Sequence, residues 1–434
     1  MIIEALEKVI AGEDLSAAEV ESLADEMRAG KATASQIAAL ATSILMKGAT
    51  AEEEKLALDA IMWPRAEAEK PGFTSHSHGA LSLALVSATH GEDLTRRQAE
   101  LAMEEVLSGK AIESELASLL AALRFKGETV EELVGFAAAM RRHAAIHFPM
   151  GRRAADEVIV DTCGTGGDAL GTFNVSTAVA FVVAGAGVRV AKHGNRSISS
   201  RCGSVDVLEA LGVIIDLPPE RVAQSIEEVG IGFLFAPAVH AATRHAMPVR
   251  RELKIRTVFN LLGPLTNPAG ASAQVAGVYD AGVTELMARA LGELGVRRAF
   301  VVHGADGLDE ISISGETSIA ELRSGEVRSY TVTPEDFGVP RAPLDAIRGG
   351  DAARNAQILL QMFGGDGRAH QDGPCRDIVL ANSAAALVAA GHAPDFLAGV
   401  RTAAESIDSG AARARLDALV AFTQSEKGHG QSAP

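Results

Sequence analysis

A glycine-rich loop in the middle of the chain carries residues whose types and spacing suit the binding of an anion. It runs Cys163-Gly-Thr-Gly-Gly-Asp168 and is followed by Thr172 and by Asn174-Val-Ser-Thr177. The glycines offer bare backbone N–H groups, and the Asn and Ser/Thr side chains are typical of a helix start, where the helix dipole favours negative charge. The alternative is a tight strand–helix turn closed by an Asn/Ser cap. Because the glycines and the helix start occur together, we favour a phosphate cradle.

A second polar loop, Lys192-His-Gly-Asn-Arg196, follows the apolar stretch 188–191 and continues into Ser197, Ser199 and Ser200. Donors of several geometries suit an anion with many oxygens, with Lys192 as a point charge and Asn195 as a directional donor. A solvated polar turn is the alternative. Loops at the ends of neighbouring strands lie where open α/β sheets bind ligands, so we expect the two loops to form one site.

Two further groups of charged residues could act on a bound anion or on its partner. Asp309-Glu310 follow a Gly-rich stretch and could hold Mg²⁺ for a diphosphate leaving group, but an exposed acidic turn explains them equally well. Arg250 and Arg251 lie in a basic segment and could clamp a carboxylate in a fork. They could also form a solvated face or a surface pair with Glu252, and their position alone does not decide between these interpretations.

Composition excludes several classes of protein. The 434 residues are 47% apolar with a net charge of −16, so nucleic acid and anionic membranes are not expected partners. The sequence begins without the basic region of a signal peptide, and its longest apolar run, 178–188, is too short for a membrane span. Cys163, Cys202 and Cys375 lack metal-like spacing. We interpret them as free, packed thiols of a cytoplasmic protein, and a nucleophilic Cys163 or Cys202 is the less favoured alternative.

The elements that must position the loops alternate between strand and helix from Asp156 onward, which predicts an α/β fold with a mainly parallel central sheet. Strands are predicted at 157–160, 188–191, 213–216, 232–236, 274–279, 299–303, 311–314 and 326–333. Helices are predicted at 174–185, 203–212, 218–230, 239–254, 283–294, 352–363, 376–390 and 394–423. The segment 257–268 is predicted to be rich in loops.

Residues 1–150 are predicted to be helical and repeat themselves at a constant offset. Gly12-Glu-Asp-Leu-Ser matches Gly91-Glu-Asp-Leu-Thr, and Met46-Lys-Gly matches Phe125-Lys-Gly. Each copy also repeats two capping boxes, Ser16/Glu19 and Thr50/Glu53 in the first, Thr95/Gln98 and Thr129/Glu132 in the second. We therefore expect a bundle of three or four helices that is present twice, with 63–79 as a linker.

Together these motifs resemble the anthranilate phosphoribosyltransferase family of tryptophan biosynthesis, within the nucleoside phosphorylase/phosphoribosyltransferase superfamily. Besides the two loops, the resemblance rests on Pro248-Val-Arg-Arg-Glu-Leu253, Phe259-Asn-Leu-Leu-Gly-Pro-Leu-Thr-Asn-Pro268 and Asp306-Gly-Leu-Asp-Glu310. It implies an enzyme that transfers the phosphoribosyl group of 5-phosphoribosyl 1-diphosphate (PRPP) to the amine of anthranilate, with Mg²⁺ as cofactor. It also implies a small helical domain beside a larger α/β domain, and a homodimer formed through the helical domain.

The resemblance also implies the residues of the site. Anthranilate would be held by Gly164, Asn195 and Arg250, with His193 beside it, and Mg²⁺ by Ser176, Asp309 and Glu310. No general base is assigned, because an aromatic amine is already neutral at pH 7. The residues expected to hold PRPP are Gly164, Gly167, Asp168, Thr172, Asn174, Val175, Ser176, Thr177, Lys192, His193, Gly194, Asn195, Arg196, Ser197, Ile198, Ser199, Ser200 and Ser204.

The chain departs from the family pattern at a few places. His240-Ala-Ala-Thr243 stands where the family often has His-Pro-Ala-Met, Cys202 where serine is usual, and Ala169 where glycine is common. The family needs only one helical copy. We therefore divide the chain into a duplicated helical extension with its linker (1–78), a helical domain (79–150, taking in part of 239–268), an α/β domain (151–424) and a tail (425–434).

Two other functions compete with this interpretation. A pyrimidine nucleoside phosphorylase-like enzyme of similar architecture would use free phosphate, but Asp309-Glu310 and Lys192-His-Gly-Asn195 fit a Mg-diphosphate substrate better. A non-catalytic relative of the same fold is disfavoured by the complete set of motifs, and the net charge of −16 disfavours nucleic-acid binding.

Overall fold

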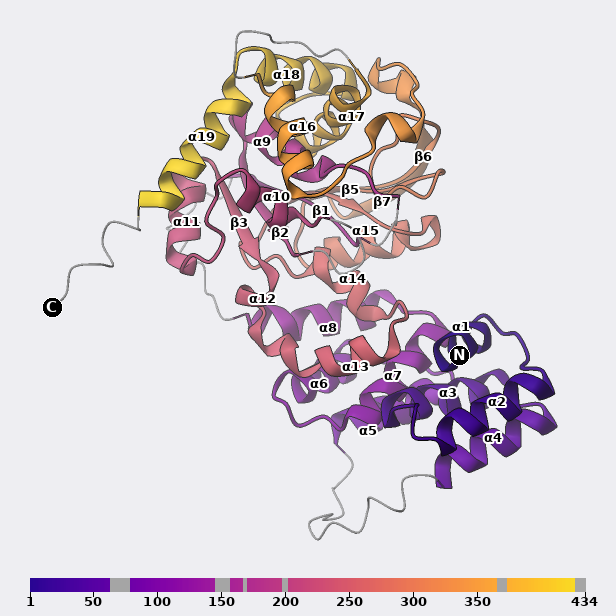
Figure 1. Cartoon of the computed structure of the whole chain (residues 1–434). Coiled ribbons are helices and arrows are strands. Elements are labelled where there is room, and N and C mark those ends of the chain that lie inside the picture. Colours follow the sequence, from indigo (N-terminus) through magenta and orange to yellow (C-terminus); the bar gives the residue numbers. More distant parts are fainter. Residues whose placement is uncertain (63–78, 145–156, 167–169, 197–201, 365–372, 426–434) are drawn as a thin grey trace, which may run out of the picture. The chain divides into compact units, whose positions relative to one another are not determined.

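The computed structural model describes residues 1–62, 79–144, 157–166, 170–196, 202–364 and 373–425 (Figure 1). The chain divides into two compact units. The helical unit comprises Met1–Ala144 and His240–Leu262, and the α/β unit comprises Ala145–Val239 and Gly263–Pro434. Each unit has its own buried core.

The helical unit contains each copy of the repeat as four helices. The first copy forms α1 (Ile2–Ile10), α2 (Ala17–Arg28), α3 (Ala34–Lys47) and α4 (Ala51–Met62). The second copy forms α5 (Ala80–Thr89), α6 (Arg96–Leu107), α7 (Glu113–Lys126) and α8 (Val130–Arg142). The predicted capping boxes are formed at the starts of α2, α4, α6 and α8, which confirms these helix starts.

One buried carboxylate organises each copy in the same way. In the second copy Glu132 is fully buried, accepts a hydrogen bond from the backbone N–H of Leu94 at 2.9 Å, and pairs with Lys126 Nζ at 3.1 Å. A buried charge is stable only when it is paired and hydrogen-bonded, so this carboxylate ties the start of α8 to the loop before α6. The first copy repeats the arrangement with Glu53, Leu15 and Lys47.

The chain enters the helical unit a second time over His240–Leu262. The helix predicted at 239–254 is broken into α12 (Ala236–Val239), a 3₁₀ turn η2 (Ala241–His245) and α13 (Met247–Leu253). Pro248 lies in the first turn of α13, where its missing N–H is tolerated, and it could not continue an earlier helix. The loop-rich structure predicted at 257–268 is also wrong, because the segment contains helix α14 (Val258–Leu265) with Pro264 in its last turn.

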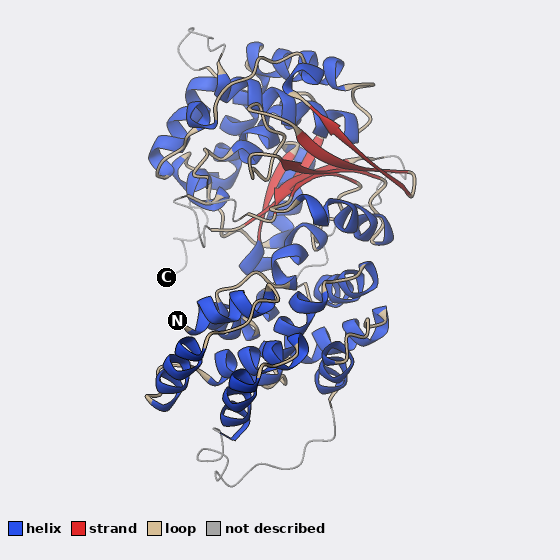
Figure 2. Cartoon of the chain, turned by 90° about the vertical axis from the view of Figure 1, so that its right-hand side faces the viewer, coloured by secondary structure: helices blue, strands red, loops and turns tan. Residues whose placement is uncertain are grey.

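The α/β unit is built on a seven-stranded sheet of order β3-β2-β1-β4-β5-β6-β7, drawn in red in Figure 2. The first five strands pair in parallel and the last two pair antiparallel, which confirms the predicted fold class. The strands are β1 (Ile159–Gly164), β2 (Arg189–Gly194), β3 (Ile231–Phe235), β4 (Ala273–Gly277), β5 (Arg298–Gly304), β6 (Thr317–Arg323) and β7 (Glu326–Val332).

Helices pack around this sheet and share its core. They are α9 (Val175–Gly185), α10 (Ser204–Ala210), α11 (Pro219–Glu228), α15 (Thr284–Glu293), α16 (Ala352–Met362), α17 (Pro374–Ala389), α18 (Phe396–Asp408) and α19 (Ala411–Gln424). Helix α17 packs against α9, β4 and β5, and both α9 and α17 are buried along most of their length because they are apolar all round. None of the helices among the described residues is long and apolar enough to cross a membrane.

Two predicted strands, at 213–216 and 311–314, are wrong for a shared reason. Neither segment pairs with the sheet. Side-chain oxygens replace the missing ladder: Ile214 N donates to Thr423 Oγ1 at 3.1 Å, and Ile311 N donates to Asn382 Oδ1 at 2.9 Å. Strand β6 was not predicted, and the helix predicted at 394–423 is interrupted at Gly410, whose φ is 78°.

Replacing Glu132 with alanine should destabilise the helical unit. The change leaves Lys126 and the Leu94 N–H without their buried acceptor, and breaking a buried ion pair costs about 3–5 kcal/mol. Glu131→Ala is the matched control, because its partner Arg96 is exposed and such pairs contribute only about 0.2–1 kcal/mol. Urea unfolding followed by circular dichroism measures both free energies, and equal losses would contradict the role of Glu132.

Candidate functional site

The carboxyl ends of the parallel strands meet at one edge of the sheet, and β1 lies where the strand order reverses. The chain proceeds outward from β1 to β2 and β3, and then places β4 on the other side of β1. Open α/β sheets bind ligands at such a switch point. The two predicted loops follow β1 and β2, so the structure places both of them at this edge.

The first loop begins at Gly164, the last residue of β1. Thr165 N donates to the backbone oxygen of Gly277 at 2.8 Å, and Gly166 has a φ of 66°, which glycine adopts freely. Before α9, Thr172 forms an isolated β-bridge with Arg348. Six of the predicted site residues lie outside the described residues: Gly167, Asp168, Ser197, Ile198, Ser199 and Ser200.

Helix α9 starts after Asn174 as predicted, but the Asn174 side chain does not cap it. Asn174 Nδ2 donates to the backbone oxygen of Cys202 at 3.2 Å, and Asn174 Oδ1 accepts from Asn355 Nδ2 at 2.9 Å. These bonds connect the start of α9 to the segment before α10 and to α16. The side chains of Val175 and Thr177 are buried, so their predicted contact with a ligand is confined to their backbone N–H groups.

Two opposite charges are buried beneath the loops. Asp161 on β1 and Lys192 on β2 are 0% and 2% exposed. Asp161 accepts hydrogen bonds from His193 N at 3.1 Å and from Asn267 Nδ2 at 2.8 Å. Lys192 Nζ donates to a backbone carbonyl of β1 and, at 3.1 Å, to Ser176 Oγ. Burial lowers the pKa of the Lys192 amine, and the nearby carboxylate of Asp161 opposes that shift.

The second loop is held by short contacts of its own. His193 is buried with Nδ1 3.1 Å from the backbone oxygen of Gly263. Ser204 Oγ donates to the backbone oxygen of Asn195 at 3.2 Å, and a Cβ at Gly194 would lie 2.4 Å from the same hydroxyl. The structure therefore brings Ser204 and Asn195 together, and only glycine fits between them.

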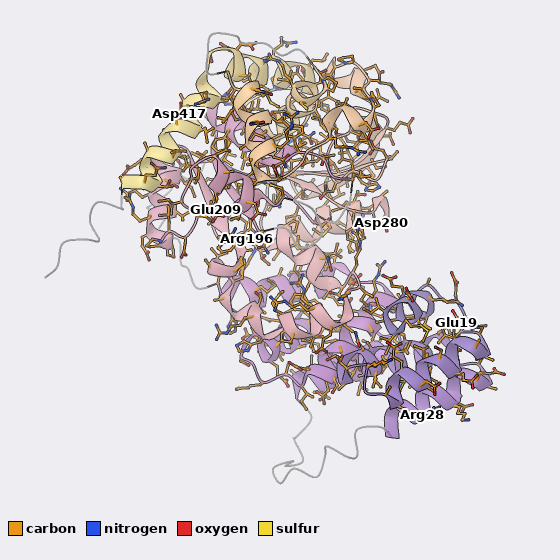
Figure 3. The ribbon with its side chains drawn as sticks, viewed as in Figure 1. Glu19, Arg28, Arg196, Glu209, Asp280 and Asp417 are labelled. Carbon is orange, nitrogen blue, oxygen red and sulfur yellow. The ribbon has the colours of Figure 1, made fainter. Side chains whose placement is uncertain are left out.

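Arg196 is already paired with carboxylates of α10. Its guanidinium lies 3.1 Å from Asp206 and 2.7 Å from Glu209, and Figure 3 labels Arg196 and Glu209. These side chains are partly exposed, so the pairs are weak and salt-dependent. The predicted contact of Arg196 with phosphate would require an anion to compete with two carboxylates.

Asp309 contacts the glycine loop, and Glu310 contacts the start of α9. Gly166 N donates to Asp309 Oδ2 at 2.9 Å, and Ser176 N donates to Glu310 Oε1 at 3.1 Å. A Cβ at Gly277 would lie 1.5 Å from the backbone oxygen of Asp309, and a Cβ at Gly164 would lie 2.7 Å from Asp309 Oδ2. Glycines at the ends of β1 and β4 therefore let the acidic pair approach the edge of the sheet.

This arrangement fits a hard divalent cation such as Mg²⁺. Mg²⁺ takes oxygen ligands and commonly uses one or two carboxylates together with water and substrate phosphate. A backbone N–H orients one oxygen of each carboxylate, and the backbone N–H that orients Glu310 belongs to Ser176. No group of three or more His, Cys, Asp or Glu residues suited to a metal occurs in the described part of the chain, so substrate oxygens would have to complete the coordination.

The cysteines near the site are not suited to act as nucleophiles. Cys163 and Cys202 are buried and form no disulfide, and burial raises the pKa of both thiols. A thiol with a raised pKa stays protonated at neutral pH, and the thiolate is the nucleophile. Gln274 Nε2 lies 3.1 Å from Cys163 Sγ, which supports the interpretation of this residue as part of the packing.

Arg250 belongs to α13 in the helical unit, whereas the other predicted anthranilate contacts belong to the α/β unit. Its guanidinium lies 5.1 Å from the centre of the Phe259 ring, and its Nη1 lies 3.7 Å from Met247 Sδ. Burial lowers its pKa, and no carboxylate among the described residues pairs with it. A cation held among apolar groups without an internal counter-ion suits a ligand carboxylate.

Sequence reasoning missed three residues that support the site. The role of Asp161 could have been recognised in the sequence, because it is a charged residue inside an otherwise apolar strand. Asn267 lies inside a recognised motif, but nothing in the spacing marks its bond to Asp161. Gly277 left no signal, because the need for glycine arises from Asp309, which is distant in the sequence.

Two family models match the chain. The α/β domain of a glycosyl transferase family matches residues 156–413. The helical bundle domain of a glycosyl transferase family matches residues 3–62 and residues 84–144. The internal repeat therefore consists of two copies of a helical bundle.

Named relatives resemble the chain over nearly their whole length. An anthranilate phosphoribosyltransferase of Solibacter usitatus is 54% identical over 341 residues, which are 79% of this chain and 98% of the relative. The crystal structure of anthranilate phosphoribosyltransferase from Thermus thermophilus is 44% identical with a TM-score of 0.73, covering 79% of this chain and 99% of that one. The Saccharomyces cerevisiae enzyme in complex with PRPP and Mg is 27% identical with a TM-score of 0.69, covering 80% and 98%.

Gly277→Ala should weaken the binding of Mg²⁺. The new Cβ would overlap the Asp309 backbone and push Asp309-Glu310 away from the loop, and losing such support typically weakens metal binding about 10- to 100-fold. Gly315→Ala is the control, because a Cβ there meets nothing within 4 Å. Calorimetric titration of Mg²⁺ in the presence of PRPP measures both affinities. An unchanged affinity in folded Gly277→Ala would refute the site.

Proposed function

The chain belongs to the anthranilate phosphoribosyltransferase family, and we propose that it transfers the phosphoribosyl group of PRPP to the amine of anthranilate. The products are N-(5-phosphoribosyl)anthranilate and diphosphate, a step of tryptophan biosynthesis. The observation that carries this proposal is the convergence of three features at the switch point of the sheet. These are the glycine loop after β1, the start of α9 and the acidic pair Asp309-Glu310. The carboxylates of the pair accept hydrogen bonds from backbone N–H groups of the other two.

The chain's own groups suit the leaving diphosphate. Backbone N–H groups of the glycine loop and of the α9 N-terminus would bind phosphate oxygens, with the charge of Lys192 beneath them. As the bond to the ribose anomeric carbon breaks in a loose, oxocarbenium-like transition state, negative charge grows on the diphosphate. Donors that are fixed in advance then stabilise the transition state more than the ground state.

Ser176, Asp309 and Glu310 would hold Mg²⁺. When bound, the ion neutralises charge that develops on the diphosphate. The orientation of both carboxylates by backbone N–H groups supports this assignment, and so does the yeast relative, whose structure contains PRPP and Mg.

Anthranilate would be oriented by the residues that the family resemblance implies. Arg250 would bind its carboxylate, and Gly164, Asn195 and His193 would be its other contacts. Because the aromatic amine is neutral at pH 7, these residues need to align its lone pair with the anomeric carbon and need not remove a proton first. The lack of a carboxylate partner for Arg250 within the described part of the chain supports its role.

The family resemblance also predicts a homodimer formed through the helical unit. The cysteines predict a cytoplasmic location, because they form no disulfide and reduced thiols are typical of the cytoplasm. The packing of the two helical copies bears directly on the oligomeric state.

Asp309→Ala combined with Glu310→Ala should abolish Mg²⁺-dependent turnover. The change removes both carboxylates that would hold the ion, so the leaving group loses most of its charge stabilisation. The loss of anthranilate fluorescence on addition of PRPP and Mg²⁺ measures the reaction. Glu227→Ala combined with Glu228→Ala, an exposed acidic pair at the end of α11, is the control and should stay active.

The same assays separate the competing functions. Turnover that survives the loss of Asp309 and Glu310 would refute the metal role. Phosphorolysis of thymidine without Mg²⁺ would favour a pyrimidine nucleoside phosphorylase, and failure to bind PRPP in a calorimetric titration would favour a non-catalytic relative.

Arg250→Ala should raise the KM for anthranilate roughly 10- to 100-fold, because a hydrogen bond to a charged group contributes about 1.5–3 kcal/mol. The KM for PRPP should stay nearly unchanged. Arg251→Ala is the matched control, since Arg251 is the exposed neighbour on the same helix. Steady-state kinetics with each substrate varied in turn measures the split, and a rise confined to the KM for PRPP would contradict the assignment.

A further inference from the structure

The helical copy at residues 1–62 has no part in the proposed reaction, but its packing points to a role. Residue n of the first copy corresponds to residue n + 79 of the second, as Gly12 does to Gly91 and Gly30 to Gly109. By this offset α3 corresponds to α7, and these two helices pack along each other within the helical unit. Contact between equivalent surfaces is the property of a twofold interface, in which both partners use the same patch.

A face of small side chains recurs on both helices. On α3, Ile37, Leu40 and Ile44 recur at the spacing of a bundle core. A second face carries Ser35, Ala39 and Ser43, which recur every four residues and are 2%, 0% and 0% exposed. On α7 the counterparts of the last two are Ser118 and Ala122, which are also buried. Because small residues let helix axes approach closely, we assign this face of each helix to the contact.

Helix α7 must pack against other elements on all of its faces. Its residues from Leu116 to Leu123 are all buried, and its sequence is apolar around the helix. A helix of this kind is stable only when it is enclosed. Helices α5, α13 and α3 all pack on α7. In a chain without residues 1–62, the face that α3 covers would be an exposed apolar surface, which another chain would have to cover.

Polar contacts at the start of α3 fix the packing, and the second copy does not repeat them. Thr33 Oγ1 donates to Glu252 Oε2 and Gln36 Nε2 donates to the backbone oxygen of Glu252, each at 2.8 Å. The counterparts of Thr33 and Gln36 are Ile112 and Glu115, which carry no side-chain donor at neutral pH. Both copies pack against α13, but these two side-chain hydrogen bonds to Glu252 are made by the first copy.

We propose that the first copy is a built-in partner that replaces a second chain. Helix α3 covers the face of α7 that another subunit would otherwise cover, so the protein is a monomer with an internal pseudo-twofold interface. The partner that this surface fits is a helical bundle of the same kind, and the chain supplies it itself. This monomer stands in place of the homodimer that the family resemblance predicts.

Sedimentation velocity of the full chain over a range of micromolar concentrations tests the oligomeric state. The expected result is one species with the mass of a single chain, 45.0 kDa, at every concentration. A species of twice that mass at every concentration would overturn the proposal.

Two variants test whether the first copy blocks association. Ala39→Arg inserts a long charged side chain into the contact, and Thr33→Ala with Gln36→Ala removes the bonds to Glu252 without overpacking. Each should release the first copy and expose α7, so the sedimenting mass should rise with concentration by up to twofold. Leu45→Arg is the matched control, because Leu45 is 57% exposed on the same helix and its counterpart is already Arg124. It should stay monomeric.

Limited proteolysis reports whether the first copy has been released in these variants. Concentration-dependent association in either variant, without association of Leu45→Arg, supports the proposal. A released first copy in a chain that remains monomeric at all concentrations would overturn it, because the exposed face of α7 would then need no partner.

Discussion

The α/β unit depends on two opposite charges, Asp161 and Lys192, that neighbouring strands carry into its interior. Removing an ion from water costs several kcal/mol, so each charge requires hydrogen bonds as well as a counter-charge. Those bonds reach His193 on the second loop, Asn267 after α14, and Ser176 at the start of α9. The bonds that make burial of the charges tolerable therefore also fix the elements that surround the proposed PRPP site.

The acidic pair follows the same principle at the surface of the sheet edge. Its carboxylates accept hydrogen bonds from Gly166 N and Ser176 N, so they are oriented before any cation or substrate arrives. This preorganisation reduces the entropy that binding would otherwise cost. It is possible only because Gly164 and Gly277 leave room where any side chain would collide with Asp309. Two residues without side chains thus determine where the most acidic part of the site can lie.

Much of this arrangement follows from local sequence, and the rest follows from contacts between distant segments. The strands before both loops and the start of α9 were predicted, because apolar runs, glycines and helix-start residues act over a few positions. The segment 311–314 was predicted to be a strand because isoleucine and serine alternate in it, but the Ile311 N–H bonds to Asn382, which is distant in the sequence. Helix α14 was missed because Gly263 and Pro264 indicate a break. Their carbonyls are satisfied by His193 and Gln274, and no local pattern shows this.

The repeat shows how a duplicated element can diverge once both copies share a chain. Tethering makes the contact between α3 and α7 intramolecular, which raises the effective concentration of the partners far above that of free chains. Each copy can then adapt to one side of the interface. At one pair of matched positions the second copy has Gly135, where a Cβ would lie 2.3 Å from the Arg96 backbone oxygen, so α8 packs close to α6. The first copy has the buried Leu56 there. The first copy therefore has a core packed in its own way, as expected of an element that keeps its fold while serving a different neighbour.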